Sequence, residues 1–102
     1  MAAPIPENPN EEGEIVRGQA AQALLSNPLL EQSIQRMKDH FTKAWSTSKI
    51  PDQSKREAAF VMFKAVEAFE AELQHLVETG KMSARTKEMR AVQGALSGQD
   101  PT

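Results

Sequence analysis

The chain has 102 residues, enough for one domain, and its hydrophobic content of 39% and charged content of 25% are ordinary for a soluble protein. It contains no cysteine, which excludes disulfides, thiolate metal sites and a cysteine nucleophile. The net charge of −2 does not favour nucleic acid, and no apolar run is long enough to span a membrane, so we expect no membrane partner.

The N-terminal residues predict a disordered arm followed by a short helix. Residues 1–10 contain three prolines, which disfavour both helix and sheet. From about Glu11 to residue 25 the chain is compatible with a helix that carries a weak apolar stripe. Gly18 lies inside this helix, and we interpret it as a surface glycine; the alternative is close contact with another helix.

A second helix is predicted from about residue 28 to residue 46. The sequence Ser26-Asn27-Pro28 ends the first helix and starts the next, with Asn27 as the cap and Pro28 at the first position, where its missing N–H costs nothing. Apolar residues recur at steps of four and three: Leu30, Ile34, Met37, Phe41 and Ala44.

The longest predicted helix covers residues 52–79 and is ended by Gly80. Its apolar stripe recurs at steps of three and four: Ala59, Met62, Val66, Phe69, Leu73 and Leu76. The short polar connection before Pro51 and the opposite net charges of the two helices predict an antiparallel helical hairpin.

A basic C-terminal helix is predicted from about residue 82 to residue 95, and 97–102 is predicted to be a frayed tail. The heptad-like positions of this helix hold Met82, Met89, Val92 and Leu96, with one arginine among them. The predicted fold is therefore all-α, with residues 11–96 as one helical domain.

The sequence holds no recognisable catalytic, cofactor-binding or metal-binding motif, so we predict that the chain is not an enzyme and has no cofactor. His40 and His75 are the only histidines, and the predicted hairpin places them too far apart to share a metal.

Two groups of residues are candidates for binding. The first lies outside the strict stripe and is predicted to contact a protein partner: Trp45, Phe60, Phe63, Val77 and Met82. The second is predicted to contact phosphate: Lys81, Arg85, Lys87 and Arg90. For these basic residues a solvated helix face, or pairing with the acidic arm of a neighbouring copy, is the favoured alternative.

Several short motifs resemble those of small, mostly uncharacterised helical proteins encoded among the head-assembly and packaging genes of tailed bacteriophages and prophages. The resemblance covers about residues 16–82 and rests on Arg17-Gly18-x-x-Ala21-x-x-Leu24-Leu25-x-Asn27-Pro28, Ala44-Trp45, Asp52, Arg56-Glu57 and Val77-Glu78-Thr79-Gly80-Lys81. It implies a phage setting and a non-enzymatic role, and it assigns no binding residue.

We therefore expect a phage interaction protein that acts in virion assembly or DNA packaging through helix–helix contacts, in the host cytoplasm or in the virion. The expected partners are further copies of the chain or other phage proteins. The alternatives are a nucleic-acid-binding packaging factor that resembles a small terminase subunit, and a small inhibitor of a host enzyme.

Overall fold

All regular structure in the described part of the chain is α-helical, which confirms the predicted all-α class. The structure is a computed structural model that describes Ile5 and residues 8–98. It contains three helices, α1 (Glu11–Leu25), α2 (Pro28–Ser46) and α3 (Gln53–Gly98). Most of the predicted arm and the end of the predicted tail lie outside the described residues.

The starts of the first two helices follow from local chemistry. The first turn of α1 contains three glutamates, Glu11, Glu12 and Glu14, which are favourable near the positive end of the helix dipole. At the start of α2 the Asn27 side chain accepts a hydrogen bond from the backbone N–H of Leu29 (2.9 Å), and Pro28 occupies the first turn. Helix α2 has the bounds predicted from the sequence.

Helix α3 does not end at Gly80. It runs without a break from Gln53 to Gly98, 46 residues in all, so the predicted end at residue 79 and the separate helix from 82 to 95 were wrong. None of the described glycines has a positive φ, and Gly80 therefore does not take the left-handed conformation of a helix end. Its role is in packing against α1.

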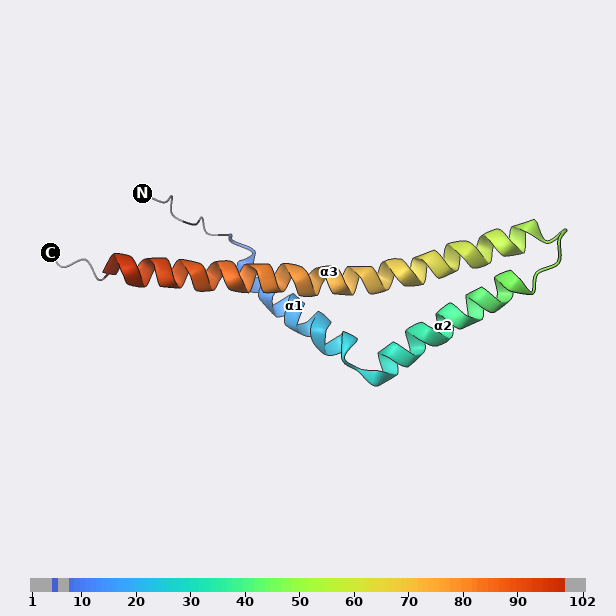
Figure 1. Cartoon of the computed structure of the whole chain (residues 1–102), viewed down its shortest axis with the longest axis horizontal. Helices are drawn as coiled ribbons and strands as arrows, with labels where there is room; N and C mark the ends of the chain where they lie inside the picture. The colour runs from blue at the N-terminus through green and yellow to red at the C-terminus, as the bar shows by residue number, and fades with distance from the viewer. Residues whose placement is uncertain (1–4, 6–7, 99–102) are drawn as a thin grey trace.

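The molecule is a long rod (Figure 1). Its extents are 81 × 27 × 17 Å and its radius of gyration is 21.9 Å, whereas a compact domain of this length has a radius of gyration of about 13 Å. Figure 1 shows α2 joined to α3 at one end of the rod and inclined away from it, while α1 crosses α3 nearer the other end. Helices α1 and α2 each pack mainly against α3 and make few contacts with each other.

The core is correspondingly small. Its centre consists of Ala21 from α1 with Leu73 and Val77 from α3. Leu25, Leu30 and Leu76 pack against this centre and are partly buried. The other buried apolar residues are Ile34, Ala59 and Val66.

The face of α3 that meets α1 and α2 is rotated from the predicted one. Ala59, Val66 and Leu73 are buried as expected, but Met62 and Phe69 are 46% and 49% exposed. The row at positions 63, 70 and 77 faces the neighbouring helices instead. Position 70 is Glu70, whose carboxylate accepts a hydrogen bond from Lys38 of α2 (2.6 Å); this bond raises the pKa of Lys38.

Helices α1 and α3 cross at a pair of glycines. A Cβ atom placed on Gly80 would lie 2.9 Å from Gly18 Cα and 2.9 Å from the carbonyl oxygen of Glu14. A Cβ atom on Gly18 would lie equally close to Gly80 Cα and to the carbonyl oxygen of Leu76. The interpretation of Gly18 as a surface glycine was therefore wrong, because only glycine permits this approach of the two backbones.

Candidate interaction surfaces

Four aromatic side chains gather near the end of the rod at which α2 and α3 are joined. Phe41 and Trp45 of α2 and Phe60 and Phe63 of α3 line a hollow of about 180 Å³, and we call these four residues the aromatic tip. Trp45 is 52% exposed and Phe60 is 54% exposed. Phe63 and Phe41 are half-buried. The tip thus presents two large aromatic surfaces to solvent on a partly buried aromatic base.

The connection beside the aromatic tip is held by Arg56. Its guanidinium donates hydrogen bonds to the backbone carbonyl oxygens of Lys49 (2.5 Å) and Ile50 (2.9 Å). The same arginine lines a second hollow of about 460 Å³ with Trp45, Phe60 and Val61. Because these hydrogen bonds join the connection to α3, they fix the backbone between the two helices that carry the exposed aromatic rings.

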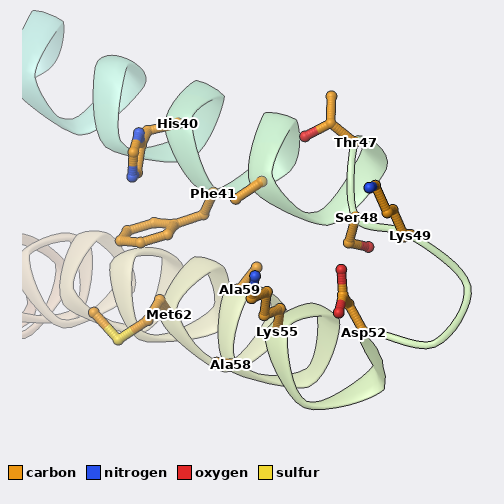
Figure 2. A pocket seen from close by; sticks show the side chains of 11 residues that line it. His40, Phe41, Thr47, Ser48, Lys49, Asp52, Lys55, Ala58, Ala59 and Met62 are labelled. Atoms are coloured by element: carbon orange, nitrogen blue, oxygen red, sulfur yellow. The ribbon is translucent and has the colours of Figure 1, made fainter.

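A third hollow lies on α2, α3 and the connection between them (Figure 2). It measures about 470 Å³ and combines the apolar side chains of Phe41, Ala59 and Met62 with the polar side chains of His40 and Lys55. The His40 ring meets the Phe41 ring edge-on, with 5.1 Å between the centroids. Among the described residues no group of three or more histidine, aspartate or glutamate side chains is placed to hold a metal ion.

A second apolar surface runs along the C-terminal part of α3. Four residues at heptad-like spacing, Met82, Met89, Val92 and Leu96, are between 55% and 66% exposed, and we call them the tail stripe. The last three line a hollow of about 380 Å³ with Ile5 and Gln93. Ile5 is tied to this region by a hydrogen bond from its backbone N–H to the Gln93 side chain (3.3 Å).

Two of the four candidate phosphate-binding residues are paired with glutamates of α1. Arg90 donates to both carboxylate oxygens of Glu11 (3.0 and 2.8 Å), and the Lys87 ammonium contacts the carboxylate of Glu12. Lys81 lies 3.8 Å from Glu78 on the same helix and is largely exposed, as is Arg85. The glutamates at the start of α1 thus lie against the basic part of α3 in the same chain.

The Glu11–Arg90 pair makes the α1–α3 crossing sensitive to acid. The hydrogen bond from Arg90, aided by its charge and that of Lys87, holds the pKa of the buried Glu11 carboxyl below its usual value. A lowered folded-state pKa contributes stability that is present above the unfolded-state pKa and is lost as the pH falls through the folded-state value.

We therefore expect the melting temperature of the wild type to decrease as the pH is lowered from the unfolded-state pKa of glutamate through the lower folded-state pKa of Glu11. A Glu11→Gln variant should show a smaller decrease. Arg90→Gln should reduce the fall in the same way, because it removes the other half of the same interaction. Thermal unfolding followed by circular dichroism across a pH series checks both variants. If the melting temperature of both variants decreased with acid as steeply as that of the wild type, this role of the pair would be contradicted.

The candidate partner-binding residues are not all on one surface. Trp45, Phe60 and Phe63 lie together in the aromatic tip, and Met82 is 64% exposed in the tail stripe. Val77 is only 7% exposed and forms part of the core, so its side chain is not presented to a partner.

Two features of these surfaces were missed in the sequence. Phe41 was assigned to the apolar stripe of α2 and left out of the predicted partner-binding residues, although its place beside Trp45 was a usable signal. The pairing of Glu11 with Arg90 joins residues 79 positions apart. Only the opposite charges of the two ends of the chain hinted at it.

Comparison of the chain with protein-family models, with curated proteins and with solved structures gives no match. None of the described helices contains a segment that is both long enough and apolar enough to cross a membrane.

Proposed function

We propose that this chain is a non-enzymatic interaction protein that binds a protein partner through helix–helix contacts at the aromatic tip. The observation that carries the proposal is the exposure of Trp45 and Phe60 side by side over a partly buried aromatic base. Exposed aromatic side chains that cluster on a rigid base are typical of the few residues that dominate binding energy at protein interfaces.

The large surface of the molecule supports the same proposal. The chain exposes 8002 Å², whereas a compact monomer of the same mass exposes about 5,700 Å². A stable protein–protein interface buries about 800 Å² of each partner. The excess surface is thus large enough for more than one interface of ordinary size.

The setting that we propose is the assembly or DNA packaging of a tailed bacteriophage, in the host cytoplasm or in the virion. This setting rests on the sequence resemblance of residues 16–82. The partner in this proposal is another protein of the particle. Inhibition of a host enzyme would use the same aromatic tip, and co-purification of the tagged chain with a host protein in place of particle proteins would favour it.

Nucleic-acid binding by the basic part of α3 is the weaker proposal. Lys87 and Arg90 are already matched by Glu12 and Glu11, which leaves Lys81 and Arg85 as the more accessible charges. Each phosphate contact adds about 0.9 to the slope of log affinity against log salt on duplex DNA. Titration of duplex DNA at a series of salt concentrations, starting from low salt, tests this role. A slope that corresponds to about four phosphate contacts would favour it.

The test of the main proposal is mass spectrometry of purified particles and assembly intermediates from cells that produce the tagged chain. We expect the wild type in one of these fractions. A Trp45→Ser/Phe60→Ser variant should be depleted at least about 30-fold, since hot-spot residues are worth about 2 kcal/mol or more each. The matched control is Leu29→Ser, which removes a 70% exposed apolar side chain from the start of α2.

The outcomes separate the parts of the proposal. Absence of the wild type from both fractions would contradict the phage setting. Undiminished recovery of the double variant would contradict the role of the aromatic tip. Depletion of the control to the same extent would show that general loss of apolar surface, and not the tip, causes the effect.

A further inference from the structure

The last two turns of α3 extend beyond the helices that support the rest of it. The contacts of α1 with α3 end near the Glu11–Arg90 pair. Beyond Arg90, the side chain of Gln93 accepts a hydrogen bond from the backbone N–H of Ile5 (3.3 Å). A short helical segment is marginal in water unless an apolar face is packed. A stable helix to Gly98 therefore requires something on the tail stripe.

The tail stripe has the pattern of a coiled-coil seam. Met82, Arg85, Met89, Val92 and Leu96 follow one another at steps of three, four, three and four. The residues that face α1, such as Ser83 and Arg90, lie about 100° or more around the helix from this seam, because successive residues are about 100° apart. The seam therefore lies on a side of α3 that α1 does not cover, and with Ile5 beside it Met89, Val92 and Leu96 are still 55–66% exposed.

Charge balance favours a second copy of this chain as the occupant. Residues 81–98 carry four basic residues and one acidic residue, and the first turn of α1 carries three glutamates. The salt bridges to Glu11 and Glu12 bring these opposite charges together, so this end of the rod is close to neutral. Two such ends can approach without strong repulsion, whereas a nucleic acid or a strongly acidic partner gains little from a neutralised surface.

We propose that two copies of the chain associate through their tail stripes as an antiparallel pair. The position of Arg85 in the seam decides the orientation. A parallel pair in register would place Arg85 against Arg85 inside the seam. In an antiparallel pair with Met89 opposite Val92 of the second copy, each Arg85 lies opposite Leu96 at the edge, where its guanidinium reaches water.

This arrangement has twofold symmetry about a point between Arg90 and Ala91, and the same patch is used by both copies. It leaves both aromatic tips exposed at the two far ends. The association does not depend on what the aromatic tip binds, so its test is separate from the test of the proposed function.

The first experiment is light scattering coupled to gel filtration, with the full chain from low micromolar to several hundred micromolar concentration. We expect the wild type to approach twice the chain mass of 11.3 kDa. A Met89→Glu/Val92→Glu variant should dissociate at least about 30-fold more readily, because both residues lie at the centre of the seam. Glutamate is a good helix former, and neither position belongs to the core.

The matched control is the Trp45→Ser/Phe60→Ser variant, which should dimerise as the wild type does. A wild type that stays monomeric at every concentration would overturn the proposal. Loss of the dimer in the tip variant, with retention in the tail variant, would overturn it as well and would assign self-association to the aromatic tip. Particle binding that fails while the dimer forms would count against the proposed function alone.

The second experiment measures orientation and uses the absence of native cysteine. A Lys81→Cys variant carries one nitroxide label per copy. In the antiparallel pair the two labelled residues are 19 residues apart along the axis, a separation of about 30 Å at 1.5 Å per residue. In a parallel pair they would be separated only by the distance between the helix axes, about 10 Å. The shorter distance would overturn the antiparallel arrangement.

Discussion

Replacement of Gly80 by leucine should lower the melting temperature by roughly 8–16 °C, with loss of α1 docking as the cause. Any side chain at this position meets the backbone of Gly18 and Glu14, which cannot rotate away as a side chain can. Overpacking of this kind costs about 3 kcal/mol, which exceeds the gain of about 1 kcal/mol from the better helix propensity of leucine. A net loss of about 2 kcal/mol corresponds to roughly 8–16 °C for a domain of this size.

The control for this prediction is Gly94→Ala in the same helix. A Cβ atom on Gly94 would meet nothing within 4 Å among the described residues, so alanine should stabilise α3. The expected gain is at most about 1 kcal/mol. Thermal unfolding by circular dichroism compares the two variants. A leucine at position 80 that left the melting temperature unchanged would contradict the glycine crossing.

Truncation of Leu73 should destabilise the protein more than truncation of Phe69, although Phe69 is the larger residue. Leu73 is 7% exposed and packs with Ala21 and Val77, so Leu73→Ala should cost about 2–5 kcal/mol. Phe69 is 49% exposed, and burial of half of its side chain is worth about 1 kcal/mol. Urea unfolding measures both values.

The comparison of these two variants tests which face of α3 meets its neighbours. Equal or reversed costs would mean that the row at positions 62, 69 and 76 lies in the interface, as the sequence pattern suggested. A larger cost for Leu73→Ala supports the row at positions 63, 70 and 77.

The local parts of the fold could be predicted because their causes are local. The Asn27 cap, Pro28 at the start of α2 and the acidic first turn of α1 are each decided by residues within one turn of each other. The three-and-four spacing on α2 and α3 likewise indicated helices that pack through one face. These features follow from hydrogen bonding and side-chain direction along a single helix.

The parts that could not be predicted depend on residues far apart in the chain. The residues around Gly80 look the same whether the glycine ends a helix or allows another backbone to approach. The approach is decided by Gly18, which is far away in the sequence. The apolar stripe of α3 is wider than one seam, so its pattern did not decide between the rows that contain Phe69 and Val77. Val77 was assigned to a binding surface for the same reason, since the sequence did not show that α1 covers it.

The candidate surfaces also differ in whether they could be predicted from residues close together in the sequence. The aromatic tip was largely visible in the sequence because Trp45 and Phe60 lie on either side of a short connection. The pairing of the basic residues with α1 was not, because it brings together segments from the two ends of the chain.

The crossing of α1 and α3 also sets the order in which the chain can fold during synthesis. Glu14 contacts Ser83, which follows it by 69 residues. At roughly 5–20 residues per second, Ser83 is synthesised roughly 3–12 s after α1 is complete. Helices α2 and α3 are joined by a short connection and can pair earlier.

During this interval α1 has no partner in its own chain, and the finished α3 of a neighbouring copy offers the same glycine. Exchange of α1 between copies is therefore the expected misassembly at high concentration. A Glu12→Cys/Lys87→Cys variant treated with a bifunctional thiol crosslinker would report it, because the linker, which spans the reach of the Glu12–Lys87 pair, would join the two cysteines within one chain after correct folding and between chains after exchange. Refolding at low and high concentration, followed by non-reducing electrophoresis, should show the exchanged form only at the higher concentration.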